Sequence, residues 1–172
     1  MNLELKTFHF TGLQNYERYA EEIDHILNAC FQCENDFFFI ALTEAVNNAA
    51  RYSVYGMSKA RITISIRIMQ NDIAVTVQSK TRPFNAFAYQ QKLIALLNDP
   101  ETCDLDWGDY TIKQLGGRGF WFILQAVDYL YVDANGQEVT LCAKTPMADK
   151  NPSGKVGDLV PKFLVKQNGV IR

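Results

Sequence analysis

The chain has 172 residues, of which 48% are hydrophobic and 21% are charged, and its formal net charge is -2. This length and apolar content suit one domain with a real core and exclude a disordered chain. The small net charge argues against a broad nucleic-acid-binding surface, and the longest apolar run, Phe37 to Leu42, is far shorter than the roughly 20 residues of a membrane span. The first residues lack a cationic segment followed by an apolar run, so we expect no signal peptide and a soluble, cytoplasmic protein.

The first third of the chain predicts a strand followed by two helices. Leu3 to Phe10 is typical of a short strand, and apolar residues recur at helical spacing from Leu13 to Cys30. Asn35 or Asp36 offers an N-cap oxygen to a second helix that runs to about Tyr52. This second helix is apolar nearly all round, which predicts burial on most of its sides.

The middle of the chain predicts a strand hairpin and then a long connection. Arg61 to Ile68 alternates strictly between isoleucine and polar residues, and Ile73 to Val77 alternates again on the return strand. From Lys80 to about Gly117 the pattern breaks up around a helical stretch near Gln91 to Leu97 and an acidic loop. A connection of this length is usually functional, for example a lid.

The last third predicts a glycine-rich turn, a helix and a second hairpin. Gly116-Gly117-Arg118-Gly119 opens an apolar helix from Phe120 to Val127. Two strands follow, 129–133 and 139–143, joined through Asn135-Gly136, which is a strong hairpin signal. We expect residues 1–145 to form one domain and residues 146–172 to form an arm that packs back on it or a tail.

The cysteines indicate little chemistry. Cys30 and Cys33 stand in a C-x-x-C spacing, which suits a redox site or half of a zinc site. There is no second such pair and the only histidines are His9 and His25. We interpret the cysteines as small core or boundary residues.

Two polar residues interrupt the apolar second helix. Glu44 and Asn48 are four apart and therefore lie on one face. A carboxylate there can accept a proton from a water or hydroxyl nucleophile, and an amide oxygen can bind Mg²⁺. The alternative is that the pair marks the solvated edge of the helix.

The glycine-rich turn is the second candidate site. Bare backbone N–H groups at a helix N-terminus suit phosphate oxygens, and Arg118 adds a charged contact. The alternative is an ordinary tight turn.

Together these motifs resemble a known family. Thr43-Glu44-Ala45-Val46-Asn47-Asn48-Ala49 is similar to the N box of the GHKL ATPases (gyrase, heat-shock chaperone, histidine kinase and mismatch-repair proteins), and most similar to that of the anti-sigma-factor serine/threonine kinases. Gly117-Arg118-Gly119-Phe120 resembles the second glycine box of that subfamily, and the hairpin after Asp128 matches its ending. The resemblance covers about residues 5 to 145.

The resemblance implies a Bergerat-type fold, an α+β two-layer sandwich whose mixed sheet is mostly antiparallel, with ATP held between the helical layer and a lid. It implies that Glu44 is the general base, that Asn48 coordinates Mg²⁺, and that Gly117, Arg118 and Gly119 approach the phosphates. It further implies a sigma factor or a small antagonist protein as partner, and family members often dimerise. We expect neither a nucleic-acid nor a membrane partner.

The chain departs from the family on the adenine side. The first glycine box, D-x-G-x-G-F, is replaced by Ser79-Lys80-Thr81-Arg82-Pro83-Phe84, so only Phe84 is kept and Ser79 stands where the adenine-binding Asp is expected. Because charge-assisted hydrogen bonds are roughly twice as strong as neutral ones, a serine weakens this contact. If Glu138 points inward, it is a candidate to replace the lost carboxylate.

Three hypotheses follow. The first is a Mg-ATP-dependent kinase or ATPase with an altered base pocket, and the second is a degenerate GHKL fold that binds a protein partner with weak or no ATP turnover. The third is a plain α+β domain that binds no nucleotide, in which Glu44 and Asn48 are surface residues.

Overall fold

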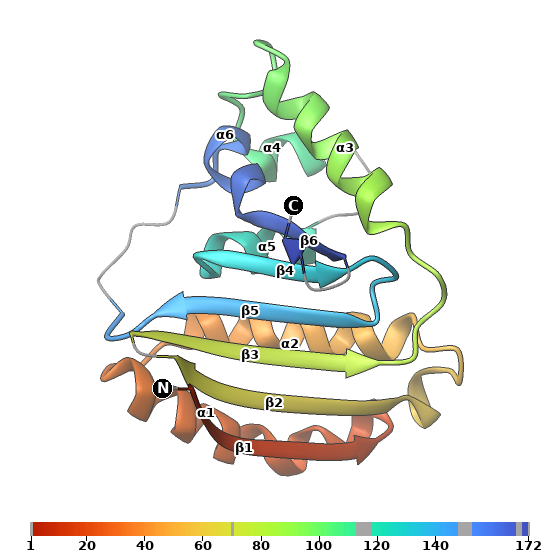
Figure 1. The fold of residues 1–172 in the computed structure, drawn as a ribbon, viewed down its shortest axis with the longest axis vertical. Helices are drawn as coiled ribbons and strands as arrows, with labels where there is room; N and C mark the ends of the chain where they lie inside the picture. The colour runs from red at the N-terminus through yellow and green to blue at the C-terminus, as the bar shows by residue number, and fades with distance from the viewer. Residues whose placement is uncertain (1, 70, 113–117, 148–152, 168–169, 172) are drawn as a thin grey trace.

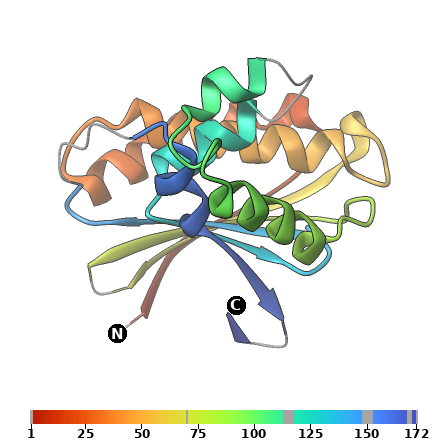
Figure 2. The ribbon, with the colours of Figure 1, turned by 90° about the horizontal axis from the view of Figure 1, so that it is seen from above.

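The computed structural model describes residues 2–69, 71–112, 118–147, 153–167 and 170–171. Its two layers are a seven-stranded sheet in the order β1-β2-β3-β5-β4-β6-β7 and a layer of helices (Figure 1). Seen from above, all the described helices lie on one face of the sheet, and none of them covers the other face (Figure 2). The expected α+β two-layer sandwich with a mixed, mostly antiparallel sheet is confirmed.

The strands follow the alternation of the sequence. Ile62, Ile64 and Ile66 are buried toward the helices, whereas the residues between them are more exposed on the open face. All neighbouring strands pair antiparallel except β4 and β6, which pair parallel. The bounds are β1 (Asn2–Thr11), β2 (Arg61–Met69), β3 (Asp72–Ser79), β4 (Tyr129–Asp133), β5 (Glu138–Lys144), β6 (Phe163–Gln167) and β7 (Val170–Ile171).

The helical layer begins with the two helices that the sequence predicts. The Asn35 side chain caps α2 by accepting a hydrogen bond from the Phe38 N–H at 2.8 Å. Of its 16 residues only Asp36, Ile40 and Arg51 are exposed, so the helix is covered on most of its sides, as expected. The bounds are α1 (Glu17–Phe31), α2 (Asp36–Arg51), α3 (Ala86–Asn98), α4 (Trp107–Ile112), α5 (Arg118–Ala126) and α6 (Val156–Leu159), with short 3-10 turns η1 (Leu13–Asn15), η2 (Met57–Lys59) and η3 (Val160–Lys162).

The long connection after β3 is largely helical. It carries α3 and α4, and Leu93 and Trp107 are buried in the core. The Trp107 N–H donates to the Gly154 carbonyl at 2.8 Å, and the Gly157 N–H donates to the Cys103 carbonyl at the same distance. The segment expected to be a lid is therefore held by backbone hydrogen bonds to the C-terminal arm.

The C-terminal arm belongs to the same core as the rest of the chain. Val156, Leu159, Phe163 and Val165 are all buried there. Strand β6 lies parallel to β4, with Leu130 opposite Phe163. Of the two expectations for residues after Pro146, packing back on the domain is the one that the described part of the arm shows.

Candidate functional site

Helix α2 places Glu44 and Asn48 one turn apart at the border of its buried stripe. Both side chains are partly buried, whereas Ala45 and Val46 beside them are buried completely or nearly so. They are therefore neither core residues nor fully solvated ones. The spacing of i and i+4 on an α-helix brings their side chains to the same face.

Helix α5 meets α2 at Glu44. A β-carbon built on Gly119, in the first turn of α5, would lie 2.6 Å from Oε2 of Glu44. Such a distance is shorter than any real contact, so the carboxylate reaches this position because residue 119 has no side chain. The two sequence motifs, which are 75 positions apart in the chain, form one site.

The electrostatics at this contact suit a negative group. The first N–H groups of a helix have no partner within the helix, and the N-terminus carries about half a positive charge. In the structure Oε2 of Glu44 lies beside Gly119 in the first turn of α5. The same region attracts phosphate oxygens. Because the Glu44 carboxylate and a phosphate repel each other, both would bind there only with a cation between them.

Ser79 lies at the end of β3 on the helix-facing side, in phase with the buried Val75 and Val77. It is 8% exposed, and its Oγ has no hydrogen-bond partner among the described residues. The neighbouring backbone ties it to α2, because the Arg82 N–H donates to the Tyr52 carbonyl at 2.8 Å just beyond the helix. An orphaned buried hydroxyl is costly in the free protein and is available to a ligand.

Glu138 lies on the opposite face of the sheet. It stands opposite Gln78 in the β3–β5 pairing and accepts a hydrogen bond from its Nε2 at 2.7 Å. Its other carboxylate oxygen is 3.5 Å from the Lys166 ammonium. Ser79 faces the helices and Gln78 does not, so Glu138 does not point inward, which was the condition for its role as a replacement carboxylate. It cannot replace the missing aspartate.

Phe84 contacts the turn between β4 and β5. Its N–H donates to the Asn135 carbonyl at 3.2 Å, and its Cβ and Cδ1 atoms lie 2.9 Å from where a β-carbon on Gly136 would stand. The side chain is 42% exposed. It therefore borders the Ser79 end of the site and does not fill it.

Of the remaining predicted residues, Arg118 is exposed at the start of α5, and Gly117 lies outside the described residues. Asn48, the predicted metal ligand, lies partly buried on α2. Throughout the described residues, no three His, Cys, Asp or Glu side chains gather as a metal site would require.

Tyr89 is a site-shaping residue that the sequence reasoning missed. Its ring is 5.5 Å from that of Phe84 and 5.3 Å from that of Phe120, in the first turn of α5. Burial raises the pKa of the Tyr89 hydroxyl to about 12. The signal was present, because Ala86, Tyr89 and Leu93 recur at helical spacing.

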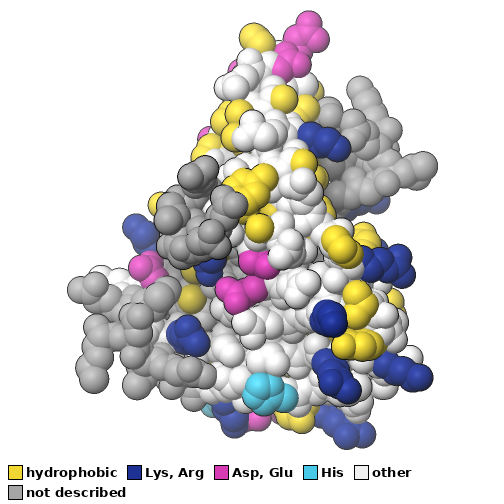
Figure 3. Space-filling view, turned by 45° about the vertical axis from the view of Figure 1, so that its right-hand side comes forward, with side chains coloured by type: hydrophobic (Ala, Val, Ile, Leu, Met, Phe, Trp, Pro, Cys, Tyr) yellow, Lys and Arg dark blue, Asp and Glu magenta, His cyan; other side chains and the backbone are white. Residues whose placement is uncertain are grey.

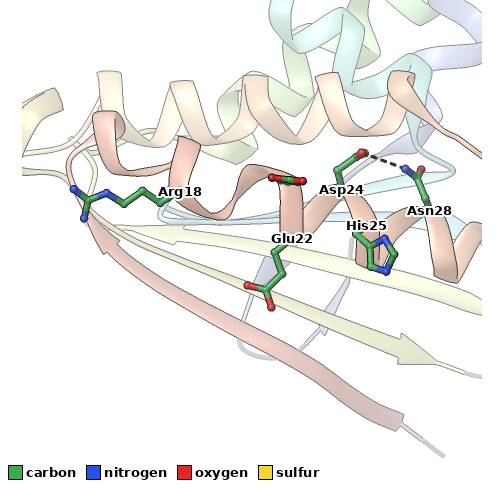
Figure 4. Close-up of a pocket in the computed structure, with 6 residues that line it drawn as sticks. Arg18, Glu22, Asp24, His25 and Asn28 are labelled. Atoms are coloured by element: carbon green, nitrogen blue, oxygen red, sulfur yellow. Dashed lines mark hydrogen bonds between the residues drawn. The ribbon is translucent and has the colours of Figure 1, made fainter.

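A hollow of about 470 Å³ lies elsewhere, on α1 (Figure 4). All six residues that line it belong to that one helix, and Arg18, Glu22 and His25 point in different directions. Asn28 donates to the Asp24 carboxylate at 3.2 Å. A groove whose polar side chains diverge has no convergent groups for catalysis, so we do not assign the site there.

Comparison with known proteins adds no family assignment: no family model and no curated protein matches this chain. The described helices include none long and apolar enough to cross a membrane. The resemblance to the GHKL ATPases therefore rests on the sequence motifs alone.

Proposed function

We propose that this chain is a nucleotide-binding regulatory protein that holds the phosphates of ATP, with Mg²⁺, between α2 and the first turn of α5. The observation that carries the proposal is the approach of Gly119 to Glu44 at 2.6 Å from a hypothetical β-carbon. Asn48 stands one turn further along the same face of α2. A carboxylate lies beside the first turn of a helix, and an amide stands one turn away on the same face, which is a combination that suits phosphate chemistry.

The donor set fits a phosphate-bound cation. Asn48 would supply an amide oxygen to Mg²⁺, and the phosphates would supply the other oxygens, as is usual for this ion. When bound, the ion supplies positive charge between the Glu44 carboxylate and the phosphates. Glu44 would accept the proton of a hydroxyl or water nucleophile, which makes phosphotransfer to a Ser or Thr hydroxyl, or hydrolysis, the reaction class.

The end of the site that would hold the adenine base offers weaker contacts than the phosphate end. Ser79 offers one unpartnered hydroxyl and no charge, so recognition of adenine is reduced relative to an aspartate. For this reason the second candidate function is a partner-binding switch with weak or no turnover. In either function we propose a small regulatory protein or a sigma factor as partner, on the basis of the resemblance alone.

Nucleotide binding is tested by thermal shift and calorimetry with ATP and ADP, with and without Mg²⁺. A ligand at one hundred times its Kd stabilises the folded state by about 2.7 kcal/mol. The informative variant is Asn48→Ala, and Asn47→Ala is its matched control because the two asparagines are adjacent and both partly buried. We expect the first variant to lose Mg²⁺-dependent binding and the second to keep it.

Turnover is tested separately with Glu44→Gln, which keeps the shape of the side chain and removes its charge. Loss of phosphate release with retained binding supports the kinase or ATPase. Binding by wild type without turnover supports the switch, and absence of binding at millimolar ATP contradicts the proposal.

A further inference from the structure

A second surface, independent of the α2–α5 site, lies where β2 begins and β3 ends. On the face shown in Figure 3, hydrophobic and basic side chains gather together at the right-hand side. The residues of this surface, which we name the basic apolar patch, are all exposed: Val54, Tyr55, Met57, Lys59, Arg61, Lys80 and Arg82.

The patch is built on two segments that are fixed to each other. The Val54 N–H donates to the Lys80 carbonyl at 3.0 Å, and Ser53 forms an isolated β-bridge with Thr81. Gly56 has a φ of 78°, which favours glycine, and it makes the turn between Tyr55 and Met57. Because backbone hydrogen bonds hold the segments, the side chains are presented without a large ordering cost on binding.

The apolar side chains in this patch are unusual for an exposed turn. Val54, Tyr55 and Met57 are each 45% exposed. Arg61 lies over the Tyr55 ring, 5.5 Å from its centroid. Tyr, Met and Arg are the residue types that are enriched at protein–protein interfaces, and adjacent exposed apolar residues often mark such a surface.

The charge around the patch is strongly one-sided. From residue 45 to residue 98 the chain has seven basic residues and one acidic residue, Asp72, although its net charge is -2. Within the described part of the chain, Lys59, Arg61, Lys80 and Arg82 form no ion pair with a carboxylate. Such unpaired cations beside apolar side chains complement a surface that is acidic and apolar.

We propose that the basic apolar patch docks an acidic protein segment whose carboxylates alternate with apolar side chains. The Tyr55 ring is already covered by Arg61, so it is not an open platform for nucleic-acid bases. The side chains of Val54 and Met57 have no strong hydrogen-bonding group with which to recognise a base. Each is about half buried, which leaves little apolar area to insert into a lipid bilayer.

The probe is a fluorescein-labelled 15-residue peptide in which Asp and Glu alternate with Leu and Phe, measured by fluorescence anisotropy without nucleotide. We expect binding that weakens with salt, and at least a tenfold loss in the double variant R61E/K80E, in line with the cost of like charges at an interface. The matched double variant K92E/K144E makes the same change of net charge elsewhere, and we expect it to bind within about twofold of wild type once the long-range effect is screened by salt. Thermal unfolding confirms that each variant folds.

A second pair of matched variants tests the contribution of the apolar side chains to peptide binding. Met57→Ala removes an exposed apolar side chain from the patch, and Ile40→Ala removes one of equal exposure, 45%, from the first half of α2. We expect Met57→Ala, and not Ile40→Ala, to lower the affinity for the peptide by about fivefold or more, as for a moderate interface contact. A peptide with Ser in place of Leu and Phe should lose most of its affinity.

Three outcomes overturn the proposal. One is equal loss in K92E/K144E and R61E/K80E, and another is unchanged binding of the Ser-substituted peptide, which would indicate charge alone. The third is tighter patch-dependent binding of anionic phosphatidylserine vesicles or of a single-stranded DNA oligonucleotide than of the peptide. Because no nucleotide is present, none of these results depends on the α2–α5 site.

Discussion

Oε2 of Glu44 lies 2.6 Å from the position that a β-carbon on Gly119 would occupy. A carboxylate on one helix is thus seated in the first turn of another, at a place that only glycine leaves open. This contact joins the two motifs of the sequence into one site. A variant that adds one methyl group at residue 119 therefore tests the site.

Gly119→Ala is expected to impair nucleotide binding while leaving the fold intact. The new methyl group meets the far end of a flexible side chain, so Glu44 moves aside at little cost, and alanine favours a helix by about 1 kcal/mol over glycine. We expect the free energy of unfolding to change by less than about 1 kcal/mol, as these two effects offset. Calorimetry with Mg-ATP should show at least a tenfold loss of affinity, and unchanged affinity would contradict the site.

Ser79→Ala is expected to separate stability from binding. The buried Ser79 Oγ has no partner, and an unsatisfied buried hydroxyl costs about 1–3 kcal/mol. Its removal should therefore raise the free energy of unfolding in denaturant melts, while the affinity for ATP relative to GTP falls. A variant that is both less stable and equally able to bind ATP would show that the hydroxyl has a structural partner and no role at the base end.

Lys162 is expected to stabilise the fold from the arm. Its ammonium group donates to the carbonyl oxygens of Leu124 and Val127, at 2.9 and 2.8 Å, where α5 ends. A cation at a helix C-terminus stabilises it, and a charged hydrogen bond contributes about 1.5–3 kcal/mol. Lys162→Met keeps the aliphatic stem and should lower the free energy of unfolding by about that amount, whereas Lys144→Met, at an exposed position, should change it by less than about 0.5 kcal/mol.

The stability of the protein is expected to fall in alkaline solution through Tyr89. Burial raises the pKa of its hydroxyl from 10.0 to about 12. Between these values the unfolded chain loses the proton and the folded chain keeps it, so the free energy of unfolding decreases as the pH rises from about 10 to about 12. Tyr89→Phe keeps the ring contacts and should flatten this part of a Tm-against-pH curve, and an unchanged slope would assign the effect to other groups.

Gly12→Ala is expected to destabilise the fold strongly. Gly12 has a φ of 82°, and a β-carbon there would lie 2.5 Å from the backbone carbonyl oxygen of Ser58. Neither the conformation nor the contact is relieved by rotating a side chain, so we expect a loss of about 2 kcal/mol or more. Gly56→Ala is the control, because it has a similar φ and nothing within 4 Å, and should lose only about 1 kcal/mol in the same denaturant melts.

Local patterns predicted most of the elements correctly. The alternation of Arg61 to Ile68 became β2, and Asn35 caps α2 through its own side chain. The hairpin at Asn135-Gly136 was also predicted correctly, and Gly136 has a positive φ of 70°, which favours glycine. Each of these signals lies within a few residues of the feature that it predicts.

Contacts between distant residues were not predictable in the same way. No local pattern shows that Phe163 lies beside Leu130, because parallel pairing depends on the whole sheet. The same is true of the proximity of Gly119 to Glu44, which the sequence suggested only through a family resemblance. The start of α3 was placed too late, although Asn85 caps it by accepting from the Ala88 N–H at 2.9 Å.

The error at Glu138 was avoidable. Val139 and Leu141 point toward the helices, and side chains alternate along a strand, so residue 138 must point to the open face. Because side chains on one face of a strand are two residues apart, the face of Val139 and Leu141 already excludes Glu138 from the base pocket. The candidate site therefore has no second carboxylate in the described residues near Ser79.

The pairing of β6 with β4 also has a consequence for solubility. If the chain were cut after Thr145, the hydrogen-bonding groups along one side of β4 would face solvent, as would Leu130 and Val132 beneath the lost residues. Unprotected strand edges of this kind template the addition of further chains. The arm thus covers this edge and prevents self-association through it. A chain shortened to residues 1–145 should therefore aggregate before it can be assayed.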